Sequence, residues 1–263
     1  MNRPVALVTG AAKRAGREFA CYFAEKGYDV VVHHHSSERD AREVVEAATR
    51  KGARALAVRA DLREPADIDN LIDATYQEFQ RLDLLVNNAS VFAQEHFPDF
   101  SIERLDEAWM VNCRAPILLI RAFYRKAAAA NATGVVVNVV DQKVRDNFHK
   151  DHFSYTVGKV AIGNLTKMLA IGVDPVLRVN AVYPGLMLPS DNQTDADFEY
   201  ASTRSNLIGR AVGPRDVAEA IVMLTLPGIA GVDFVVDGGQ NLIPVDQDVL
   251  YLHRAPAAAK SGG

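Results

Sequence analysis

Tyr155 and Lys159 have side chains and a spacing suited to acid–base chemistry. They open a segment whose apolar residues recur with helical spacing as far as Leu169. Residues four apart on a helix share one face, with about 5–6 Å between their Cβ atoms, so the phenol and the ammonium can share a pocket. A neighbouring cation lowers the pKa of a phenol, which predicts a proton donor for carbonyl or imine reduction. A solvated helix face is the alternative interpretation of the same pair.

A turn of small residues near the N-terminus has the composition of a phosphate-binding loop. Residues 5–8 form a short apolar run, typical of a strand buried on both faces of a parallel sheet. Gly10 and Gly16 follow, and a helical apolar pattern begins at Phe19. Glycine permits close backbone approach, and free N–H groups at a helix start attract a pyrophosphate. The turn therefore predicts dinucleotide binding, although its spacing is not GxGxxG and a plain tight turn would explain the glycines equally well.

The end of the next predicted strand, residues 28–33, is where a residue that recognises the adenosine ribose is expected. An acid there would favour NAD by repelling a 2′-phosphate. The chain has His33 to His35 and then Ser36 and Ser37 instead. With Arg14 nearby, these imidazoles and hydroxyls predict a pocket for the extra phosphate of NADP(H). No metal site is predicted, because alternate residues of a strand point to opposite faces.

Polar residues also follow later predicted strands, at the carboxyl ends where ligands bind in open parallel sheets. Asp61 follows residues 55–58 and could accept from the adenine amino group, or cap the helix after Pro65. Asn88, Ala89 and Ser90 lie in a small polar turn after residues 82–86. Asp141 follows residues 134–140, and Pro184 and Gly185 follow residues 178–182.

A long helix is predicted from Ile102 to Ala130, with Pro116 as a kink. Asn112 falls among its apolar residues, and a buried amide needs partners. It could satisfy carbonyls freed by the kink, which is compatible with a structural or a catalytic role. Residues 190–200 are polar and acidic with few apolar positions, which predicts a mobile lid over the site.

Strand and helix patterns alternate throughout, ending with a strand at residues 234–236. This alternation predicts an α/β fold: a single-domain Rossmann-type doubly wound parallel sheet of about seven strands with helices on both faces. We expect residues 1–243 to form one dinucleotide-binding catalytic domain. Residues 244–263 are weakly patterned and are expected to form a partly disordered C-terminal tail.

Composition narrows the class of protein. A chain of 263 residues that is 49% hydrophobic can bury one large core. A net charge of −4 without a basic stripe argues against nucleic-acid and membrane partners. The sequence contains neither a signal-peptide core nor 18 consecutive apolar residues, which predicts a soluble cytoplasmic protein. Cys21 and Cys113 are predicted to be buried reduced thiols.

Together these motifs resemble the short-chain dehydrogenase/reductase family over nearly the whole chain. The resemblance implies a nicotinamide cofactor, a Tyr155/Lys159 pair supported by Asn112, and a homotetramer. One position departs from the family: Asp141 stands where a serine is usual. An ionised carboxylate would repel the oxyanion of a reduced ketone. Beside a tyrosine, however, an acid can donate or relay a proton to a pterin nitrogen as hydride arrives at the adjacent carbon.

Within the family the chain most resembles the pteridine reductases, and dihydromonapterin reductases are similar. The shared residues are Thr9 to Arg14, His35 with Ser37, Asn87 to Phe92, and Val140 with Asp141. Ser36 departs from the arginine of that subgroup. The interval from Asp141 to Tyr155 is one residue longer than the family spacing, so the sequence leaves the distance between them open.

The resemblance implies a role for each matched residue. Phe92 would stack the pterin against the nicotinamide, or could instead be a core aromatic beneath a loop. Asp141 and Tyr155 would supply protons, and Lys159 would hold the nicotinamide ribose. The implied substrate-binding residues are Arg14, Ser90, Phe92, Asp141, Tyr155 and Leu186. The implied cofactor-binding residues are Gly10, Lys13, Arg14, Ala15, His35, Ser36, Ser37, Asp61, Leu62, Asn88, Ala89, Ser90, Tyr155, Lys159, Pro184 and Gly185.

The sequence thus predicts an NADPH-dependent reductase of dihydropteridines such as dihydrobiopterin or dihydromonapterin. A general NADPH-dependent carbonyl or 3-oxoacyl reductase is a second hypothesis, and Asp141 and Phe92 argue against it. A non-catalytic NADP(H)-sensing protein is a third, and it would need neither Tyr155 nor Lys159.

Overall fold

The computed structural model describes residues 3–190 and 193–253. Within these residues one parallel sheet of seven strands has the order β3-β2-β1-β4-β5-β6-β7. The predicted fold class is therefore confirmed. The strands are β1 (Val5–Val8), β2 (Asp29–His34), β3 (Ala55–Arg59), β4 (Leu84–Asn87), β5 (Gly134–Val139), β6 (Leu177–Pro184) and β7 (Asp233–Val236).

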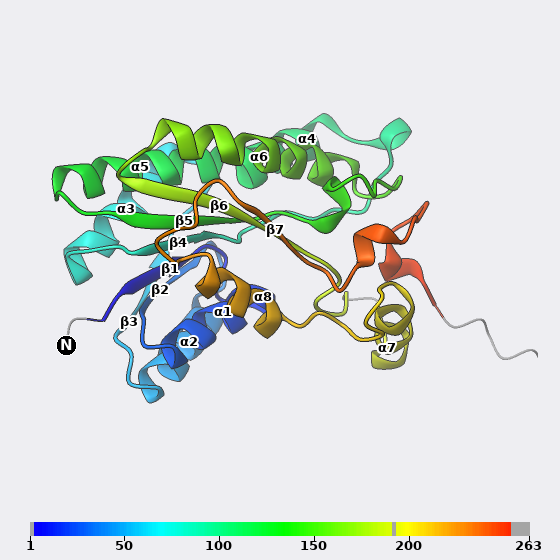
Figure 1. The fold of residues 1–263 in the computed structure, drawn as a ribbon, viewed down its shortest axis with the longest axis horizontal. Coiled ribbons are helices and arrows are strands. Elements are labelled where there is room, and N and C mark those ends of the chain that lie inside the picture. The colour runs from blue at the N-terminus through cyan, green and yellow to red at the C-terminus, as the bar shows by residue number, and fades with distance from the viewer. Residues whose placement is uncertain (1–2, 191–192, 254–263) are drawn as a thin grey trace, which may run out of the picture.

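Helices cover both faces of the sheet, which explains why the central strands are continuous apolar runs. Every residue of β1, β4 and β5 is buried. In Figure 1, α1, α2 and α8 lie below the sheet, and α3, α4, α5 and α6 lie above it. Each layer has its own hydrophobic core. The helices are α1 (Arg14–Glu25), α2 (Glu38–Arg50), α3 (Pro65–Phe79), α4 (Ile102–Trp109), α5 (Ala115–Ala129), α6 (Phe153–Gly172), α7 (Asp195–Arg204) and α8 (Pro214–Met223).

The strand order reverses between β1 and β4. β1 pairs with β2 on one side and with β4 on the other, both in parallel. In such sheets the loops after the two central strands diverge and leave a crevice at their carboxyl ends. In Figure 1 this edge faces right, toward α7 and residues 244–253.

The predicted long helix is interrupted earlier than expected. A π-helical turn, Met110–Arg114, joins α4 to α5, and it ends before Pro116. Proline has no N–H with which to close the α-helical bond to the carbonyl four residues back, at Asn112. The wider turn therefore replaces the kink predicted at Pro116 itself, and it includes Asn112.

Residues 190–200, predicted as a mobile lid with few core residues, contain the start of α7. The Thr194 side chain accepts a hydrogen bond from the Asp197 N–H and caps this helix. Ala201 of α7 is fully buried. A threonine followed three residues later by an acid is a helix-start signal that the polar composition masked. Residues 191 and 192 lie outside the described residues, and mobility of the segment stays a prediction.

Residues 244–253 of the predicted tail form a segment held against the rest of the fold. This C-terminal segment contains a 3-10 turn, Val249–Tyr251. The Asp248 N–H donates to Asp151 at 2.7 Å, and Gln193 donates to the Leu250 carbonyl at 2.9 Å. Residues 254–263 of the predicted tail lie outside the described residues, so the prediction of partial disorder stays a prediction.

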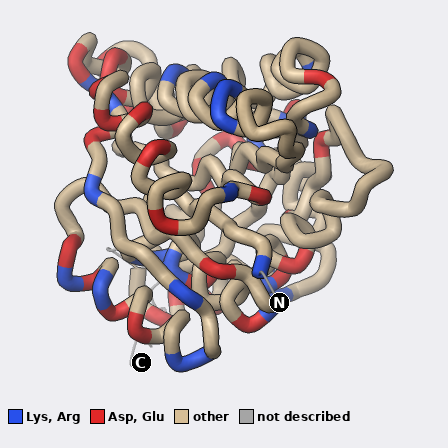
Figure 2. Tube along the Cα trace, turned by 90° about the vertical axis from the view of Figure 1, so that its left-hand side faces the viewer, with Lys and Arg blue, Asp and Glu red and all other residues tan. Residues whose placement is uncertain are grey.

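The remaining predictions from composition concern thiols and charge. Cys113 is buried as expected, Cys21 is only half-buried, and burial raises the pKa of both free thiols. Figure 2 shows acidic and basic residues interspersed over one side of the described chain, without a continuous basic stripe. None of the helices in the described residues is long and apolar enough to cross a membrane.

Candidate functional site

A cleft of about 720 Å³ lies at the carboxyl edge of the sheet. It is lined by the loops after β1 to β6 and by the C-terminal segment. Its size is that of a pocket for a cofactor and a small substrate. Predicted site residues that line it are Gly10, Lys13, Arg14, Ala15, His35, Asp61, Leu62, Asn88, Ala89, Ser90, Phe92, Asp141, Tyr155, Gly185 and Leu186.

The glycine turn after β1 packs tightly against the turn after β4. Gly10 has φ +63°, and a Cβ there would lie 3.1 Å from the Ala89 Cα. At Gly16 a Cβ would lie 2.3 Å from the Gly10 oxygen. Thr9 accepts hydrogen bonds from the N–H groups of Asn88 and Ala89, both at 2.9 Å. The turns after β1 and β4 therefore brace one another and leave the start of α1 open to a phosphate.

The consecutive histidines at the end of β2 have different surroundings: His33 is buried in the fold, and His35 lines the cleft. The Gly10 N–H donates to His33 Nδ1 at 2.9 Å, and His33 Nε2 donates to the Ala60 carbonyl at 3.1 Å. Burial lowers the pKa of His33 to about 4, so this imidazole is neutral and structural. His35 lines the cleft. Ser36 and Ser37, predicted to bind cofactor, do not line it, because the chain turns away there into α2.

Asp61 lies in the cleft but is already paired. It accepts hydrogen bonds from Arg63 Nε at 2.9 Å and Nη2 at 2.7 Å, and this pairing lowers its pKa to about 2. The alternative role as a helix cap is wrong, since Glu64 precedes the first residue of α3. Basic side chains that line this end of the cleft are Lys13, Arg14, His35 and Arg63. Lys13 is paired with Asp40 at 3.2 Å, and His35 lies 3.5 Å from Asp61.

Tyr155 and Asp141 form the central pair of the site. The Tyr155 hydroxyl donates to Asp141 Oδ2 at 2.7 Å, and the Lys143 N–H donates to Asp141 Oδ1 at 2.9 Å. The distance that the sequence left open is thus a direct hydrogen bond. Burial and the Asp141 carboxylate raise the pKa of Tyr155 well above its usual value. The expectation that Lys159 lowers this pKa is wrong, because the carboxylate is the closer charge.

Lys159 is buried behind the tyrosine and does not line the cleft. Its ammonium lies 5.7 Å from the Tyr155 ring centroid and donates to the Val139 carbonyl at 2.7 Å. Burial lowers its pKa to about 8. Gly158 allows α6 to approach the π turn this closely, since a Cβ there would lie 2.8 Å from the Asn112 Cβ.

Asn112 holds the loop after β4 rather than its own helix. Its Oδ1 accepts from the Val91 N–H at 2.9 Å, and its Nδ2 donates to the Val91 carbonyl at 3.0 Å. The prediction that this amide satisfies freed helix carbonyls is wrong. Because Val91 lies between Ser90 and Phe92, the two bonds fix the residues on either side of it at the cleft. Asn112 itself and Pro184 do not line the cleft.

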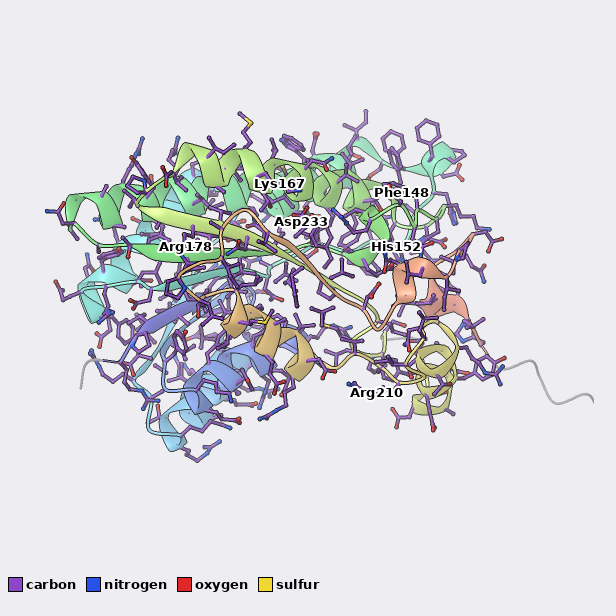
Figure 3. The ribbon with its side chains drawn as sticks, in the orientation of Figure 1. Phe148, His152, Lys167, Arg178, Arg210 and Asp233 are labelled. Carbon is purple, nitrogen blue, oxygen red and sulfur yellow. The ribbon has the colours of Figure 1, made fainter. Side chains whose placement is uncertain are left out.

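Phe92 is a half-exposed platform, with 46% of its surface accessible. The alternative of a core aromatic beneath a loop is therefore wrong. One of its ring contacts is a stack on His152 at a centroid distance of 3.8 Å, and the Tyr155 ring meets it edge-on at 4.7 Å. His152 also stacks on Tyr251 of the C-terminal segment, at 6.1 Å. Figure 3 shows His152 beside that segment.

Sequence reasoning missed the residues that line the other end of the cleft. Gln142, Lys143 and His149 come from the irregular loop after β5, and Asp248 comes from the C-terminal segment. The Asp233 carboxylate anchors this loop by pairing with Arg145 at 3.2 Å, and it also pairs with Lys167 of α6 at 3.0 Å. Figure 3 shows Asp233 and Lys167 close together. The loop has no periodicity and the segment is weakly patterned, so no local signal marked them. Among the described residues, no group of three or more His, Cys, Asp and Glu side chains could hold a metal ion.

A doubly wound sheet with a glycine turn at its switch point, and a hydrogen-bonded acid–tyrosine pair in the cleft at the same edge, is typical of a nicotinamide-dependent oxidoreductase. Comparison with known families agrees. The model described as enoyl-(acyl carrier protein) reductase matches residues 10–241. The chain belongs to the short-chain dehydrogenase/reductase family.

Three relatives show how wide this family is. 3beta-hydroxysteroid dehydrogenase 1 of Eggerthella lenta is 33% identical over 90% of this chain and 94% of its own. Pteridine reductase 1 of Leishmania tarentolae is 33% identical, over 91% and 96%. The structure of FolM alternative dihydrofolate reductase 1 from Brucella canis, complexed with NADP, is 30% identical with a TM-score of 0.86, over 94% and 97%. Membership of the family shows that this protein is an NAD(P)-dependent oxidoreductase. It does not identify the substrate, because these relatives are named for different compounds.

Proposed function

We propose that this protein reduces dihydropteridines with NADPH. The observation that carries the proposal is the Tyr155–Asp141 hydrogen bond of 2.7 Å beside the exposed ring of Phe92. A flat heteroaromatic ring that needs a proton as it receives hydride fits a platform with an acid pair at its edge. Similarity to pteridine reductase 1 and to FolM supports this substrate class.

The cofactor is NADP(H). No side chain caps the start of α1, and the turn before it lines the cleft, so its N–H groups are available to a pyrophosphate; Lys13, Arg14 and His35 line the same end. These basic side chains favour a 2′-phosphate over a bare ribose hydroxyl. When bound, the cofactor supplies the hydride. The family resemblance implies that Lys159 holds the nicotinamide ribose, and here its ammonium lies behind Tyr155, bonded to the Val139 carbonyl.

The protein's own part of the reaction is to deliver a proton. Because burial and Asp141 raise the pKa of Tyr155, the phenol stays protonated at neutral pH. The phenol and the carboxylate hold one proton between two oxygens 2.7 Å apart. As hydride reaches the ring carbon, the adjacent nitrogen becomes basic and takes this proton from the pair. The ammonium of Lys159 then offsets the negative charge left behind.

A general carbonyl or 3-oxoacyl reductase is the second candidate, since relatives such as the steroid dehydrogenase act on other compounds. A ketone gains negative charge on oxygen during reduction. Asp141, with both of its oxygens already accepting hydrogen bonds, would repel that charge where a hydroxyl would donate to it. A purely cofactor-sensing protein would have no use for the pair.

The substrate and cofactor are tested together by following oxidation of NADPH at its absorbance band. Purified protein should turn over dihydrobiopterin or dihydromonapterin and should prefer NADPH to NADH. Rapid reduction of a β-ketoester, with no turnover of any pterin, would replace this proposal with the carbonyl reductase. We also propose a homotetramer in the cytoplasm on the family resemblance, and light scattering tests the assembly.

A further inference from the structure

The end of the cleft beyond Phe92 contains an ammonium group that the fold leaves without a partner. Lys143 is 2% exposed, lines the cleft, and has no hydrogen-bond acceptor for its Nζ among the described residues. Its nearest recorded contacts are ring faces, with the Tyr155 centroid at 4.8 Å and the Phe92 centroid at 6.0 Å. Burial lowers the pKa of this lysine, and nearby carboxylates partly restore it. A buried donor of this kind is normally satisfied by something, here by an occupant of the cleft.

An acceptor without a partner lies beside this donor in the sequence. Gln142 is 5% exposed, lines the same cleft, and its Oε1 accepts no hydrogen bond from the described residues. The carboxylate of Asp248 and the imidazole of His149, 3.6 Å apart, also line the cleft. The lining of this cleft therefore includes a buried donor and a buried acceptor from consecutive residues, and the Asp248 carboxylate acts on the charge of Lys143.

The chemistry of these groups selects among possible occupants. A hydroxyl both donates and accepts, so it can satisfy Lys143 and Gln142 at once. A carboxylate could satisfy only the lysine, and it would meet the negative charges of Asp141 and Asp248. An alkyl group would leave both partners unsatisfied, which is unfavourable for buried polar groups. Two or more neighbouring hydroxyls fit best.

The position of the group follows from the reaction under the proposed function, on which this inference rests. In a 7,8-dihydropterin the reduced bond is N5=C6, and C6 also carries the substituent of the ring. The substituent therefore begins two bonds from the nitrogen that takes the proton of the Tyr155–Asp141 pair. Lys143 lies over the Tyr155 ring, with its ammonium 4.8 Å from the ring centroid, so it is a side chain near the proton-donating pair that could reach the first atoms of that substituent.

We propose that Lys143 and Gln142 form a subsite for the hydroxyl groups of the C6 side chain, and that the protein is selective for dihydropterins with a polyhydroxyalkyl substituent. Lys143 donates to a side-chain hydroxyl oxygen, and a hydroxyl of the same chain donates to Gln142 Oε1. The subsite sets specificity, whereas the proton still comes from the Tyr155–Asp141 pair.

The test compares substrates that differ only at C6: dihydromonapterin and dihydrobiopterin, which carry hydroxyls, and 6-methyl-7,8-dihydropterin, which carries none. Lys143→Met keeps the length of the side chain and removes the donor. It should lower kcat/KM about ten- to a hundredfold for the two hydroxyalkyl substrates and less than about threefold for the methyl compound. Lys150→Met makes the same change at an exposed lysine of the same loop and is the matched control.

Gln142→Leu is a second, independent variant, which keeps the subsite testable if Lys143→Met fails to fold. It should show the same selectivity for hydroxyalkyl substrates. Equal losses for all three pterins would overturn the subsite, because the lysine would then support the chemistry itself. Dihydrofolate, assayed alongside the three pterins, carries carboxylates in its C6 substituent; a loss confined to it would indicate a carboxylate site and would also overturn the subsite. If the wild-type protein reduces none of these pterins, the proposed function fails and the subsite fails with it.

Discussion

Replacing Asp141 with asparagine isolates the charge of the carboxylate from its shape. The Tyr155 hydroxyl would still find an oxygen at about the same place, because the two side chains are isosteric. A hydrogen bond from a neutral donor to a charged acceptor contributes about 1.5–3 kcal/mol, roughly a 10- to 150-fold effect. Loss of a positioned acid–base group lowers rates by about 10²–10⁴. Asp141→Asn should therefore lower kcat for dihydropterin by at least about a hundredfold.

The same variant has a signature in the pH profile. After burial, Asp141 is the largest cause of the raised Tyr155 pKa. Removing its charge lets the phenol ionise at lower pH, so the alkaline limb of kcat should move to lower pH. NADPH affinity, measured by fluorescence titration, should change less than about threefold, because the carboxylate contacts no part of the glycine turn.

Asp146→Asn is the matched control. Asp146 is exposed in the same loop and has φ +69°, a conformation that asparagine also adopts. Its turnover should equal that of the wild type. If Asp141→Asn keeps kcat within about threefold of the wild type, the proton-donating pair is refuted. Asp141 would then act only as a hydrogen-bond partner, as the usual serine of the family could.

Three further substitutions test other parts of the site. Tyr155→Phe should bind NADPH normally and lose about 10²–10⁴ in turnover, measured by cofactor oxidation, and surviving activity would exclude the phenol as proton donor. Lys159→Met should inactivate the protein yet raise its melting temperature at pH 7, since burial of the ammonium lowers its pKa from 10.5 to about 8, equivalent to about 3 kcal/mol. The unfolded chain holds this proton up to a higher pH than the folded chain does, so the free energy of unfolding of the wild type should rise relative to that of the variant between pH 8 and 10.5. The same dependence of unfolding free energy on pH in both proteins would contradict this. Phe92→Leu should raise KM for pterins about two- to tenfold with kcat little changed, because a ring stack is worth about 0.5–1.5 kcal/mol beyond burial; an unchanged KM would show that the ring is no platform.

The sequence by itself determined the layers of the fold and two local motifs of the candidate site. Buried parallel strands are continuous apolar runs, and helices repeat every 3.6 residues, so both are visible in local patterns. The glycine turn at Gly10 and the four-residue spacing of Tyr155 and Lys159 are local as well. Both were recognised because a motif of a few residues has nearly the same geometry wherever it occurs.

Only the tertiary structure decided how distant segments meet. Tyr155 and Asp141 are 14 residues apart across an irregular loop, and their 2.7 Å contact depends on how that loop packs. The pairing of Asn112 with Val91 joins two elements 21 residues apart. Lys143 is buried against the rings of Tyr155 and Phe92, which come from two other parts of the chain.

The direction in which the Tyr155 pKa is shifted also depends on how distant segments pack. Charge interactions depend on distance and burial, and neither is encoded in the spacing of residues along the chain. The four-residue spacing correctly paired Tyr155 with Lys159 on one helix, but the fold brought the Asp141 carboxylate closer than the ammonium. Local pattern therefore placed the two candidate groups on one helix, and long-range packing decided which charge lies closer to the phenol.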